Sequence, residues 1–596
     1  MEIAQKHPTH RYRTHTCHEL RADNAKGTVK LSGWVHHRRD HGGVVFVDLR
    51  DHFGLTQVVL DPKVLPEAEK LRSEWVIQIE GTVQLRPEGQ ANPAMATGDI
   101  EVIASTLVIH NSSETPPFEI ESHGGDVAEE LRLEYRYLDL RREVMQNNLK
   151  LRHRIMQWSR SYFDAKGFLE IETPMLVKGT PEGSREYLVP SRLHPGEMYV
   201  LPQSPQQMKQ LLMVSGFDKY VQFARCFRDE DQRGDRQPEF TQLDMEMSFV
   251  SQEDVMAVLE DWALGVTKAA VPHKTLQQEI IPVMTWDEAM DAYGSDKPDI
   301  RFDMRIQEAT PLLSNLGIVF LDNALAEGAV IKALVVPGGA GFPRSVIDGY
   351  VELAQKNKAK GLSWLAFDDN GMRGSIAKFV DEPTAEKIKE TLKVSQGDAV
   401  FFVAEQWENA VSCLGALRLD LAKRLNLLDN NLLAYLWVTE FPLFEKGDDG
   451  SLGASHHPFT RPLEEHIDLL ETDKLAARSY TYDLVLNGVE IGGGSVRIHE
   501  QTLQKRVFEL LGMKEEEIQQ RFGHILKAFS YGVPPHAGCA MGIDRLVMLF
   551  ADQPTIREVI AFPKNQKARD LMFGAPTPMP LSALHEANIE IYEHLD

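Results

Sequence analysis

Hydrophobic and polar residues alternate in five short runs near the start of the chain. The runs begin at residues 28, 44, 55, 74 and 100, and Gly, Pro and Asp residues separate them. A period of two is typical of strands that bury one face. Five such strands in so short a segment predict a small closed barrel.

One face of the second predicted strand has a composition that suits nucleic-acid binding. Alternation places Phe46, Asp48 and Arg50 on the same side, and we expect Arg38 and Arg39 in the preceding loop. Oligonucleotide-binding barrels stack an unpaired base on such an aromatic ring while cations hold the phosphates. A place in the hydrophobic core is the alternative for Phe46.

After the barrel the pattern changes several times. Residues 113–140 are polar and rich in Pro and Gly, which predicts a linker. Leu151 and Ile155 then begin a run with helical spacing, and a strand that ends at Pro174 follows. From 296 to 428 predicted strands alternate with predicted helices, which indicates an inserted α/β unit. We therefore expect a multidomain α+β protein.

Length and charge narrow the class of protein. At 596 residues and 67.3 kDa the chain is too long for one compact core, and 43% hydrophobic with 26% charged residues excludes a disordered chain. The net charge of −24 excludes a globally basic nucleic-acid binder. The first 112 residues are nearly neutral and hold nine of the 21 His residues, so a local patch there can still meet a polyanion. A neutral domain without that use is the alternative.

Cysteine usage and the N-terminus indicate a reducing compartment. The four cysteines lie far apart and form no Cys-x-x-Cys pair, which argues against a disulfide framework and a thiolate zinc site. The first residues lack the apolar core of a signal peptide, and no apolar run approaches the roughly 18 residues of a membrane span. We expect a cytoplasmic protein without a membrane partner.

Any nucleotide must be bound without the usual glycine-rich loops. The sequence contains no Gly-Lys dipeptide and no Gly-x-Gly-x-x-Gly fingerprint, which excludes a P-loop. Residues 227–240, FRDEDQRGDRQPEF, instead form a predicted charged loop between two apolar strands. Arg228 in this loop is suited to a phosphate, and an acidic neighbour can accept a hydrogen bond from an adenine amino group. Solvated surface charges are the alternative.

A second candidate segment covers residues 482–498. The Asn-Gly pair in its middle predicts a two-residue hairpin turn. That turn would place Asp483 opposite Gly492 and make Asp483 and Glu490 diagonal neighbours, about 7–8 Å apart. Two carboxylates at that reach can share a Mg²⁺ ion that also binds phosphates, and Arg497 offers a planar fork for a carboxylate. Edge carboxylates that merely solvate a hairpin are the alternative.

A third candidate segment, residues 538–550, combines small residues with an apolar helix in GCAMGIDRLVMLF. Gly and Ala allow a backbone to approach a ligand closely, and Arg545 at the start of the helix is placed to meet a phosphate or an adenine ring. Ordinary packing of a strand against a helix is the alternative.

Together these segments resemble the three signature motifs of class II aminoacyl-tRNA synthetases. GFLEIETP resembles the first motif, FRDE with RQPEF the second, and GCAMGIDR the third, with Ala540 where the family often has glycine. Further segments, among them TPEGSREYLVPSR, LPQSPQQMKQLLM and SHHPFT, are similar to the bacterial aspartyl-tRNA synthetases along essentially the whole chain. The signatures of class I synthetases are absent from the sequence.

The resemblance implies a domain organisation. It implies a five-stranded OB-fold barrel, an antiparallel catalytic sheet of the class II type and an α/β insertion of the kind found in bacterial aspartyl enzymes. The expected ranges are 1–112 for the anticodon-binding barrel, 113–140 for a hinge linker, 141–295 for the first catalytic part with motifs 1 and 2, 296–428 for the insertion, 429–564 for the second catalytic part with motif 3, and 565–596 for a C-terminal extension.

The resemblance also implies an activity. A ligase of this kind activates L-aspartate with ATP to aspartyl-adenylate and pyrophosphate, and then transfers aspartate to the 3′-terminal adenosine of tRNA-Asp. A homodimer is expected, because motif 1 forms the dimer interface in the family. The alternatives are an asparaginyl or lysyl relative and a catalytically inactive tRNA-binding paralogue. The presence of both Lys209 and Arg497 argues against the first, and the complete set of motif arginines and acids argues against the second.

The site residues implied by the resemblance fall into groups by ligand. The residues expected around aspartate are Arg497 and Lys209 for its side-chain carboxylate, Glu182, Gln206 and Asp244 for its ammonium group, His456 closing over it, and Arg228 at its attacking carboxylate. The expected ATP-binding residues are Arg228, Asp229, Glu230, Gln237, Glu490, Gly542, Ile543, Asp544 and Arg545, of which Arg228 and Arg545 are the expected catalytic residues. Mg²⁺ is expected at Asp483 and Glu490.

In the barrel the resemblance implies tRNA recognition. Phe46 is expected to stack on an anticodon base, Gln57 to read a base edge, and Arg39 to lie nearby. His41 and Gly89 stand where relatives specific for tRNA-Asp commonly have an apolar and a larger residue, which is similar to the relaxed type that also aspartylates tRNA-Asn. A tRNA-dependent amidotransferase would then convert Asp-tRNA-Asn to Asn-tRNA-Asn. An enzyme restricted to tRNA-Asp, with plain turns at both positions, is the alternative.

Overall fold

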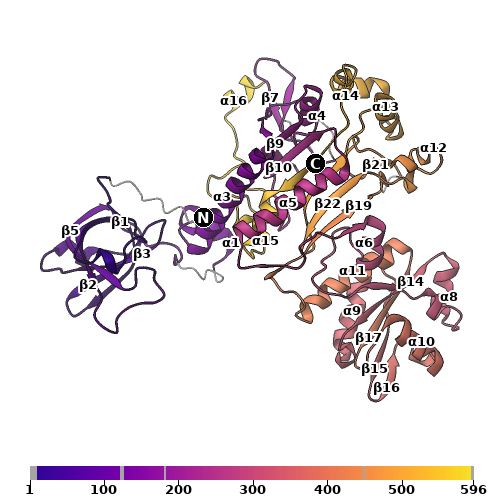
Figure 1. Ribbon diagram of the computed structural model, residues 1–596, viewed down its shortest axis with the longest axis horizontal. Helices are drawn as coiled ribbons and strands as arrows, with labels where there is room; N and C mark the ends of the chain where they lie inside the picture. The colour runs from indigo at the N-terminus through magenta and orange to yellow at the C-terminus, as the bar shows by residue number, and fades with distance from the viewer. Residues whose placement is uncertain (1–9, 121–126, 180–182, 448–449, 592–596) are drawn as a thin grey trace. The chain divides into compact units, whose positions relative to one another are not determined.

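The computed structural model describes residues 10–120, 127–179, 183–447 and 450–591 (Figure 1). The chain divides into two compact units, Met1–Leu149 with Asp570–Ala575, and Lys150–Arg569 with Pro576–Asp596. In the described ranges no helix combines the length and the apolar character needed to cross a membrane.

The first unit contains the predicted five-stranded barrel. Its strands are β1 (Thr28–His41), β2 (Val44–Arg50), β3 (Leu55–Leu60), β4 (Val76–Leu85) and β5 (Ile100–Asn111). They pair in the order β1-β2-β3-β5-β4 and close on themselves, which confirms the barrel and its strand number. Alternate residues such as Leu31, Val47 and Ile79 fill the interior, because successive side chains of a strand point to opposite faces.

The prediction that Arg38 and Arg39 lie in a loop is wrong. Both belong to β1, which continues to His41 and pairs there with Val44. The turn is only two glycines long, and both have positive φ, 61° and 82°. Such a turn matches the twist of the flanking strands, so the ladder runs to its very end.

Helices follow the barrel within the first unit. They are α1 (Glu129–Glu134), α2 (Arg136–Asp139) and the start of α3 (Glu143–Ala165). The buried carboxylate of Glu74 in the barrel accepts hydrogen bonds from Arg50 and Arg141, each at 2.7 Å. Most of the described part of the predicted linker after residue 128 is helical, and Arg141, directly after the predicted linker, is bonded to the barrel.

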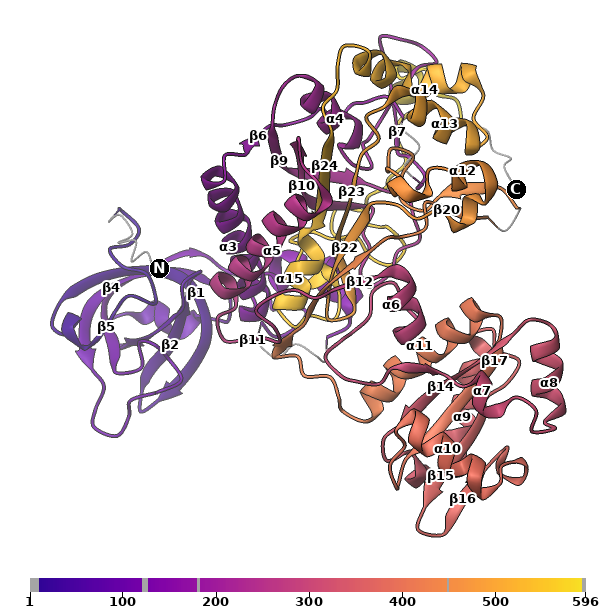
Figure 2. The same cartoon turned by 45° about the vertical axis from the view of Figure 1, so that its right-hand side comes forward.

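The second unit is built on an eight-stranded sheet (Figure 2). In spatial order the strands are β12 (Val283–Thr285), β19 (Tyr435–Thr439), β22 (Thr481–Leu486), β23 (Val489–Val496), β24 (His536–Gly542), β10 (Glu239–Ser248), β9 (Lys219–Phe227) and β6 (Leu169–Glu170). All neighbours are antiparallel except the two edge pairs, β12 with β19 and β6 with β9. This is the predicted antiparallel sheet.

The two faces of β10 differ in character, and this difference positions the site. Leu243 and Met245 are buried in a hydrophobic core with residues of α3, α5 (Gln252–Ala270) and α15 (Ile543–Phe550). Asp244 and Glu246 alternate with them and so point to the opposite face, where α4 (Gln206–Val214) brings Lys209 against them.

The region predicted as an α/β insertion has its own five-stranded sheet. In spatial order its strands are β13 (Ile306–Glu308), β14 (Val330–Val336), β17 (Ala399–Glu405), β15 (Ser363–Asp368) and β16 (Gly371–Gly374), and its longer helices are α8 (Val319–Ala326), α9 (Arg344–Lys356), α10 (Glu382–Leu392) and α11 (Trp407–Arg424). Strands and helices alternate along the chain as predicted, but every pair is antiparallel. The reason is that β17 inserts between β14 and β15 and runs against both.

Further helices and strands belong to the second unit. They are β7 (Leu188–Pro190), β8 (Met198–Val200), β11 (Thr275–Leu276), α6 (Trp286–Tyr293), α7 (Thr310–Leu313), β18 (Leu432–Leu433), β20 (Phe444–Lys446), β21 (Leu452–Ala454), α12 (Leu469–Thr472), α13 (Gln501–Leu510), α14 (Glu515–Phe529) and α16 (Leu581–Glu586).

Candidate active site

A cavity of about 340 Å³ opens on the polar face of β10. Side chains from α4, the β9–β10 loop, β22, β23 and the β24–α15 junction line it. The three segments singled out in the sequence, 227–240, 482–498 and 538–550, therefore meet in one place. The predicted residues in its lining are Gln206, Lys209, Arg228, Glu230, Gln237, Asp244, His456, Asp483, Glu490, Arg497, Gly542, Asp544 and Arg545.

Among the described residues, Asp229 and Ile543 are predicted ATP contacts that do not line this cavity. Ile543 is fully buried in the hydrophobic core, because the apolar face of α15 packs there. The backbone N–H of Asp229 donates to the carbonyl of Arg185 at 3.1 Å. Glu182 lies outside the described residues, so its role stays a prediction.

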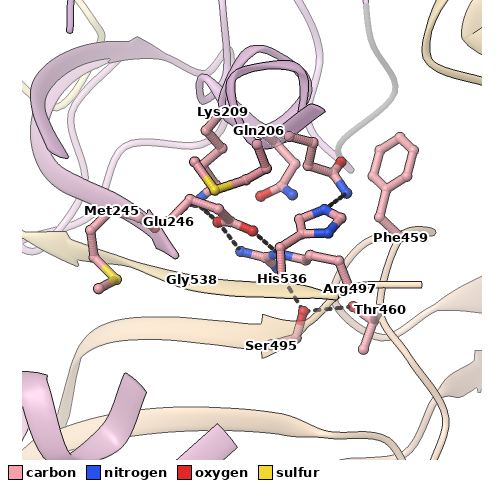
Figure 3. A network of polar contacts seen from close by, with 12 residues as sticks. Gln206, Lys209, Met245, Glu246, Phe459, Thr460, Ser495, Arg497, His536 and Gly538 are labelled. Atoms are coloured by element: carbon pink, nitrogen blue, oxygen red, sulfur yellow. Dashed lines mark hydrogen bonds and ion pairs between the residues drawn. The ribbon is translucent and has the colours of Figure 1, made fainter. Parts of the chain in front are cut away.

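Lys209 and Arg497, which lie far apart in the sequence, meet at Glu246 (Figure 3). Glu246 accepts hydrogen bonds from Nε of Arg497 at 2.9 Å and from Nη2 at 3.1 Å. The Nζ of Lys209 lies 3.1 Å from Oε2 of Glu246. The three side chains are at most 2% exposed, so a carboxylate of the protein itself holds the two cations together in a buried site.

Charge pairing sets the ionisation of this cluster. Burial disfavours ionised Glu246, but Arg497 and Lys209 outweigh it and lower the pKa of Glu246 to about 2. Burial raises the pKa of Asp244 above its usual value, although Lys209 lies 2.7 Å from its Oδ1. Its Oδ2 atom is buried and has no hydrogen-bond partner among the described residues. Asp244 thus keeps one oxygen available for a cationic group of a ligand.

The guanidinium of Arg497 is also held at its other end. Nη1 donates to Oγ of Ser495 and to Nε2 of His457, each at 2.6 Å. Burial and the nearby Arg497 lower the pKa of His457 well below its ordinary value, so the ring is neutral and its Nε2 accepts. Because Glu246 fills the fork formed by Nε and Nη2, the donor left over is the second N–H of Nη2.

His536 supports the cluster from β24. Its Nδ1 lies 2.8 Å from the carbonyl oxygen of Pro534, which can only accept, so Nδ1 carries the proton. Nε2 then accepts from the side-chain amide of Gln210 at 3.1 Å. Burial lowers the pKa of His536 to about 4, so the ring adds no charge at neutral pH. Its backbone carbonyl accepts from the N–H of Arg497 at 2.9 Å, which fixes the start of that side chain.

Glu246, His457, Ser495 and His536 are site residues that the sequence analysis missed. A signal existed for Glu246, because polar and apolar residues alternate in QLDMEMS and must place Asp244 and Glu246 on one face. A similar signal existed for Ser495, because it lies two residues before Arg497 and alternation places both on one face. No local pattern marks His457 or His536, since the chain brings them to the cluster only through tertiary packing.

The hairpin at 482–498 differs from its predicted register. Val485 pairs with Glu490 as predicted, but Asp483 pairs with Gly493 and not with Gly492. A bulge at Ile491 inserts one extra residue and shifts every pair beyond it. A Cβ atom at Gly493 would lie 2.5 Å from Oδ1 of Asp483, so this glycine leaves the space that the carboxylate occupies.

Asp483 and Glu490 both line the cavity, with Asp483 next to His456. Oδ1 of Asp483 lies 3.4 Å from Nε2 of His456. Burial raises the pKa of Asp483, and Asp483 in turn raises the pKa of His456 against the effect of burial. Within the described ranges no group of three or more His, Cys, Asp or Glu side chains is gathered as a metal site. A divalent cation here would need further oxygen ligands from a bound molecule.

Two more cations stand in another part of the lining. The guanidinium of Arg228 lies 5.1 Å from the centre of the Phe240 ring. Nη1 of Arg545 donates to the carbonyl oxygen of Glu490 at 2.8 Å, and its Nη2 lies 3.1 Å from Asp235. These side chains offer positive charge beside an aromatic surface, which suits a nucleotide with several phosphates.

The predicted nucleic-acid residues lie on the barrel. Phe46 is half-buried outside the hydrophobic core of the barrel and pairs in register with Arg39. Arg39 donates to Asp48 at 2.9 Å, and the amide of Gln57 donates to Glu101 at 2.8 Å. His41 is exposed at the end of β1. A Cβ atom at Gly89 would meet nothing within 4 Å, but its φ of +79° suits glycine.

Family models match both units. The model "tRNA synthetases class II (D, K and N)" matches residues 128–566. The chain belongs to this family of class II tRNA synthetases. The model "OB-fold nucleic acid binding domain" matches residues 29–109 of the synthetase, the region of the five-stranded barrel.

Several relatives are similar to this synthetase over nearly its full length. The "Aspartate–tRNA(Asp/Asn) ligase" of Rubrobacter xylanophilus is 49% identical over 587 residues, with 98% of both chains covered. The protein of the same name from Moorella thermoacetica is 50% identical, and the match covers 96% of both chains. That from Bacillus subtilis is 47% identical, and the match covers 97% of this chain and 98% of the relative.

Solved structures show the same fold at low identity. The asparaginyl-tRNA synthetase of Pyrococcus horikoshii, in complex with asparaginyl-adenylate, has a TM-score of 0.57 and 18% identity, and the match covers 92% of this chain and 97% of that one. The asparaginyl-tRNA synthetase of Entamoeba histolytica, in a complex of the same kind, gives the same TM-score and identity with 92% and 97% coverage.

Replacing Glu246 by Gln should destabilise the synthetase. The change leaves two buried cations with too little negative charge, which typically costs about 3 kcal/mol or more. We expect the midpoint of thermal unfolding, measured by scanning calorimetry, to fall by about 5 °C or more. Glu170→Gln is the control, because it removes an exposed ion pair with Arg160 and should shift the midpoint by less than about 1 °C. Equal shifts for the two variants would contradict the central role of Glu246.

Proposed function

We propose that this protein is an aspartate–tRNA ligase that charges both tRNA-Asp and tRNA-Asn. The observation that carries the proposal is the buried meeting of Lys209 and Arg497 in a cavity that also holds Arg228, Arg545 and an acidic pair. This arrangement suits a small dicarboxylic amino acid beside a polyphosphate. The names of the full-length relatives support the same activity.

The charge balance of the pocket explains a preference for aspartate. Glu246 neutralises one of the two cations. Oδ2 of Asp244, which has no hydrogen-bond partner in the part of the chain that the structure describes, suits the ammonium group of an amino acid. One positive charge then remains for the substrate side chain. The carboxylate of aspartate neutralises it, whereas the amide of asparagine would leave a buried charge without compensation, which is unfavourable.

The chemistry of activation requires no nucleophile from the protein. The α-carboxylate of aspartate attacks the α-phosphorus of ATP in line, the bond to the β-phosphate oxygen breaks, and pyrophosphate leaves. Arg228 is placed to neutralise charge on the attacking carboxylate and the α-phosphate, and Arg545 to neutralise charge on the terminal phosphates. Catalysis then rests on positioning and on charge stabilisation in a shaped cavity. The 3′-terminal ribose hydroxyl of tRNA next attacks the carbonyl of the adenylate, and AMP leaves.

Asp483 and Glu490 are the residues that would hold Mg²⁺. Their carboxylates are hard oxygen donors, and the space above Gly493 keeps the first of them open toward the cavity. Because the described residues offer two acids here and not three, the ion would take its other ligands from ATP phosphates and water. When bound, it would neutralise phosphate charge.

We also propose that the protein is a homodimer. Large apolar side chains are exposed in the segment after α3 that resembles motif 1 and in the stretch that follows it, and exposed apolar surface often marks a protein interface. The exposed fractions are 54% for Leu169, 51% for Leu176, 62% for Leu188 and 45% for Met198.

Amino-acid-dependent exchange of pyrophosphate into ATP tests the proposed activation step. We expect exchange with aspartate and a rate with asparagine lower by about 100-fold or more, because a buried uncompensated charge costs several kcal/mol. Arg228→Ala should lower the rate with aspartate by about 100-fold or more while the fold persists. Arg225→Ala is the control, because Arg225 lies on the same hairpin and forms a partly exposed ion pair with Glu239. Brisk exchange with asparagine, or an unchanged rate in Arg228→Ala, would refute these assignments.

Replacing Asp483 by Asn tests the metal site. The amide keeps the shape of the side chain but removes the charge that attracts the cation, so the Mg²⁺ concentration for half-maximal exchange should rise about tenfold. Asp235→Asn is the control, since Asp235 also lines the cavity but is assigned to no metal. The assignment fails if both variants show the wild-type Mg²⁺ requirement.

Charging of purified tRNA-Asn tests the tRNA range. We expect aspartate to be attached to tRNA-Asn at a rate within about tenfold of that for tRNA-Asp, since position 41 carries a polar histidine where an apolar residue is common in tRNA-Asp-specific relatives, and position 89 a glycine where a larger residue is common. The product would require a tRNA-dependent amidotransferase to become Asn-tRNA-Asn. Fast charging of tRNA-Asp with no detectable charging of tRNA-Asn would restrict the enzyme to one tRNA.

A further inference from the structure

The carboxylate of Asp544 joins three segments of the second unit. Asp544 lies in the first turn of α15 and is 4% exposed. Its Oδ1 accepts a hydrogen bond from Nη1 of Arg152 on α3 at 2.5 Å, and its Oδ2 accepts from the backbone N–H of Thr241 on β10 at 2.9 Å. Helix α3 and strand β10 are therefore both bonded to α15.

The end of a strand explains why β10 needs this carboxylate. β24 pairs with β10 up to Gly542, which lies opposite Gln242, and the chain then turns into α15. Thr241, the next residue along β10, is buried and pairs with Arg225 of β9 on one side, but on the other side the β24 ladder has ended, so its N–H meets no strand residue there. A buried N–H without an acceptor is costly, and Oδ2 of Asp544 takes the place of the missing strand.

Arg152 fixes the orientation of that carboxylate. Its side chain is only 16% exposed. Besides its hydrogen bond to Asp544, Nη1 of Arg152 lies 3.4 Å from the carbonyl oxygen of Val559. The guanidinium is therefore held between α3, α15 and the segment after α15. Without it, the buried charge of Asp544 would lack its cation and would gain from turning toward solvent.

The residues adjacent to these hydrogen bonds form the nucleotide part of the cavity. Phe240 directly precedes Thr241 and lies under Arg228, and Arg545 directly follows Asp544. Both Phe240 and Arg545 line the cavity, whereas Arg152 does not. Lys209 and Arg497 are bonded to Asp244 and Glu246, which lie further along β10, and neither bonds to Asp544 or Arg152.

We propose that Arg152 is a positioning residue for ATP, acting through Asp544. By holding the carboxylate of Asp544, Arg152 sets the position of Phe240 relative to Arg545. These two residues form the two sides of the cavity between which the nucleotide would lie. Asp544 then connects α3 and β10 to α15, and its side chain has no need to contact ATP directly. The inference rests on the proposed function only in taking ATP as the ligand of this part of the cavity.

Calorimetric titration of the full-length protein with ATP and Mg²⁺ tests the proposal without requiring any amino acid to be activated. We expect Arg152→Met to raise the Kd for ATP by about tenfold or more, since small displacements of binding groups have effects of this size. In pyrophosphate exchange the KM for aspartate should stay within about twofold of wild type, because the Lys209–Glu246–Arg497 cluster is untouched. This split between the two substrates would not arise from a general loss of folded protein.

Arg160→Met is the matched control. Arg160 lies on the same helix and forms an ion pair with Glu170 at 3.0 Å, with both side chains partly exposed. We expect no change in the Kd for ATP or in the KM for aspartate. An equal rise in the Kd for ATP in Arg152→Met and Arg160→Met would overturn the proposal.

Arg152→Lys serves if the Met variant does not fold. An ammonium group keeps the charge beside Asp544 but lacks the planar guanidinium, so the Kd for ATP should rise by a smaller factor, about threefold. A wild-type Kd for ATP in both Arg152 variants, or equal losses for ATP and aspartate, would overturn the proposal. If ATP binding weakens as expected while no amino acid supports exchange, the positioning role stands and the proposed synthetase activity fails.

Discussion

Burial of two cations next to each other is the constraint on which the site depends. Lys209 and Arg497 are almost completely removed from water, and such a pair is tolerated only when anions lie against it. Glu246 and Asp244 supply them, with distances of 2.7–3.1 Å to the cationic nitrogens. The neutral rings of His457 and His536 complete the hydrogen bonds without adding charge. The result is a rigid pocket in which the protein's own carboxylates hold the two cations in place, and one positive charge remains for a substrate carboxylate once an ammonium group lies against Asp244.

The antiparallel sheet makes this arrangement possible. A strand presents side chains to its two faces in turn, so β10 can bury methionines in the core and carboxylates in the site over the same few residues. Its neighbours contribute at matching positions, since β23 leads into Arg497 and β24 begins with His536. Because the carboxylates and His536 stand on paired strands, Lys209 on α4 and Arg497 directly after β23, their separations follow largely from the strand spacing.

Much of this organisation was predictable from local pattern. The five barrel strands, the charged loop at 227–240 and the strands and helices of the insertion all follow from alternation and turn residues. The failures are also instructive. The bulge at Ile491 displaced the partner of Asp483 by one residue, and a two-glycine turn extended β1 through Arg38 and Arg39. The insertion proved wholly antiparallel because β17 enters between two strands that are far from it in sequence.

The sequence by itself determined the residue types, the strand and helix periods and the likeness to a synthetase family, because these depend on neighbours along the chain. It contained both cations and both acids of the pocket. No local pattern, however, indicates that Glu246 lies between Lys209, which is 37 positions before it, and Arg497, which is 251 positions after it. Only the tertiary structure decided that contact, the link from Arg152 through Asp544 to Thr241, and the tautomer of His536. Each of them arises where distant segments pack together, and the cost of leaving a buried charge or donor unpaired then selects which groups meet.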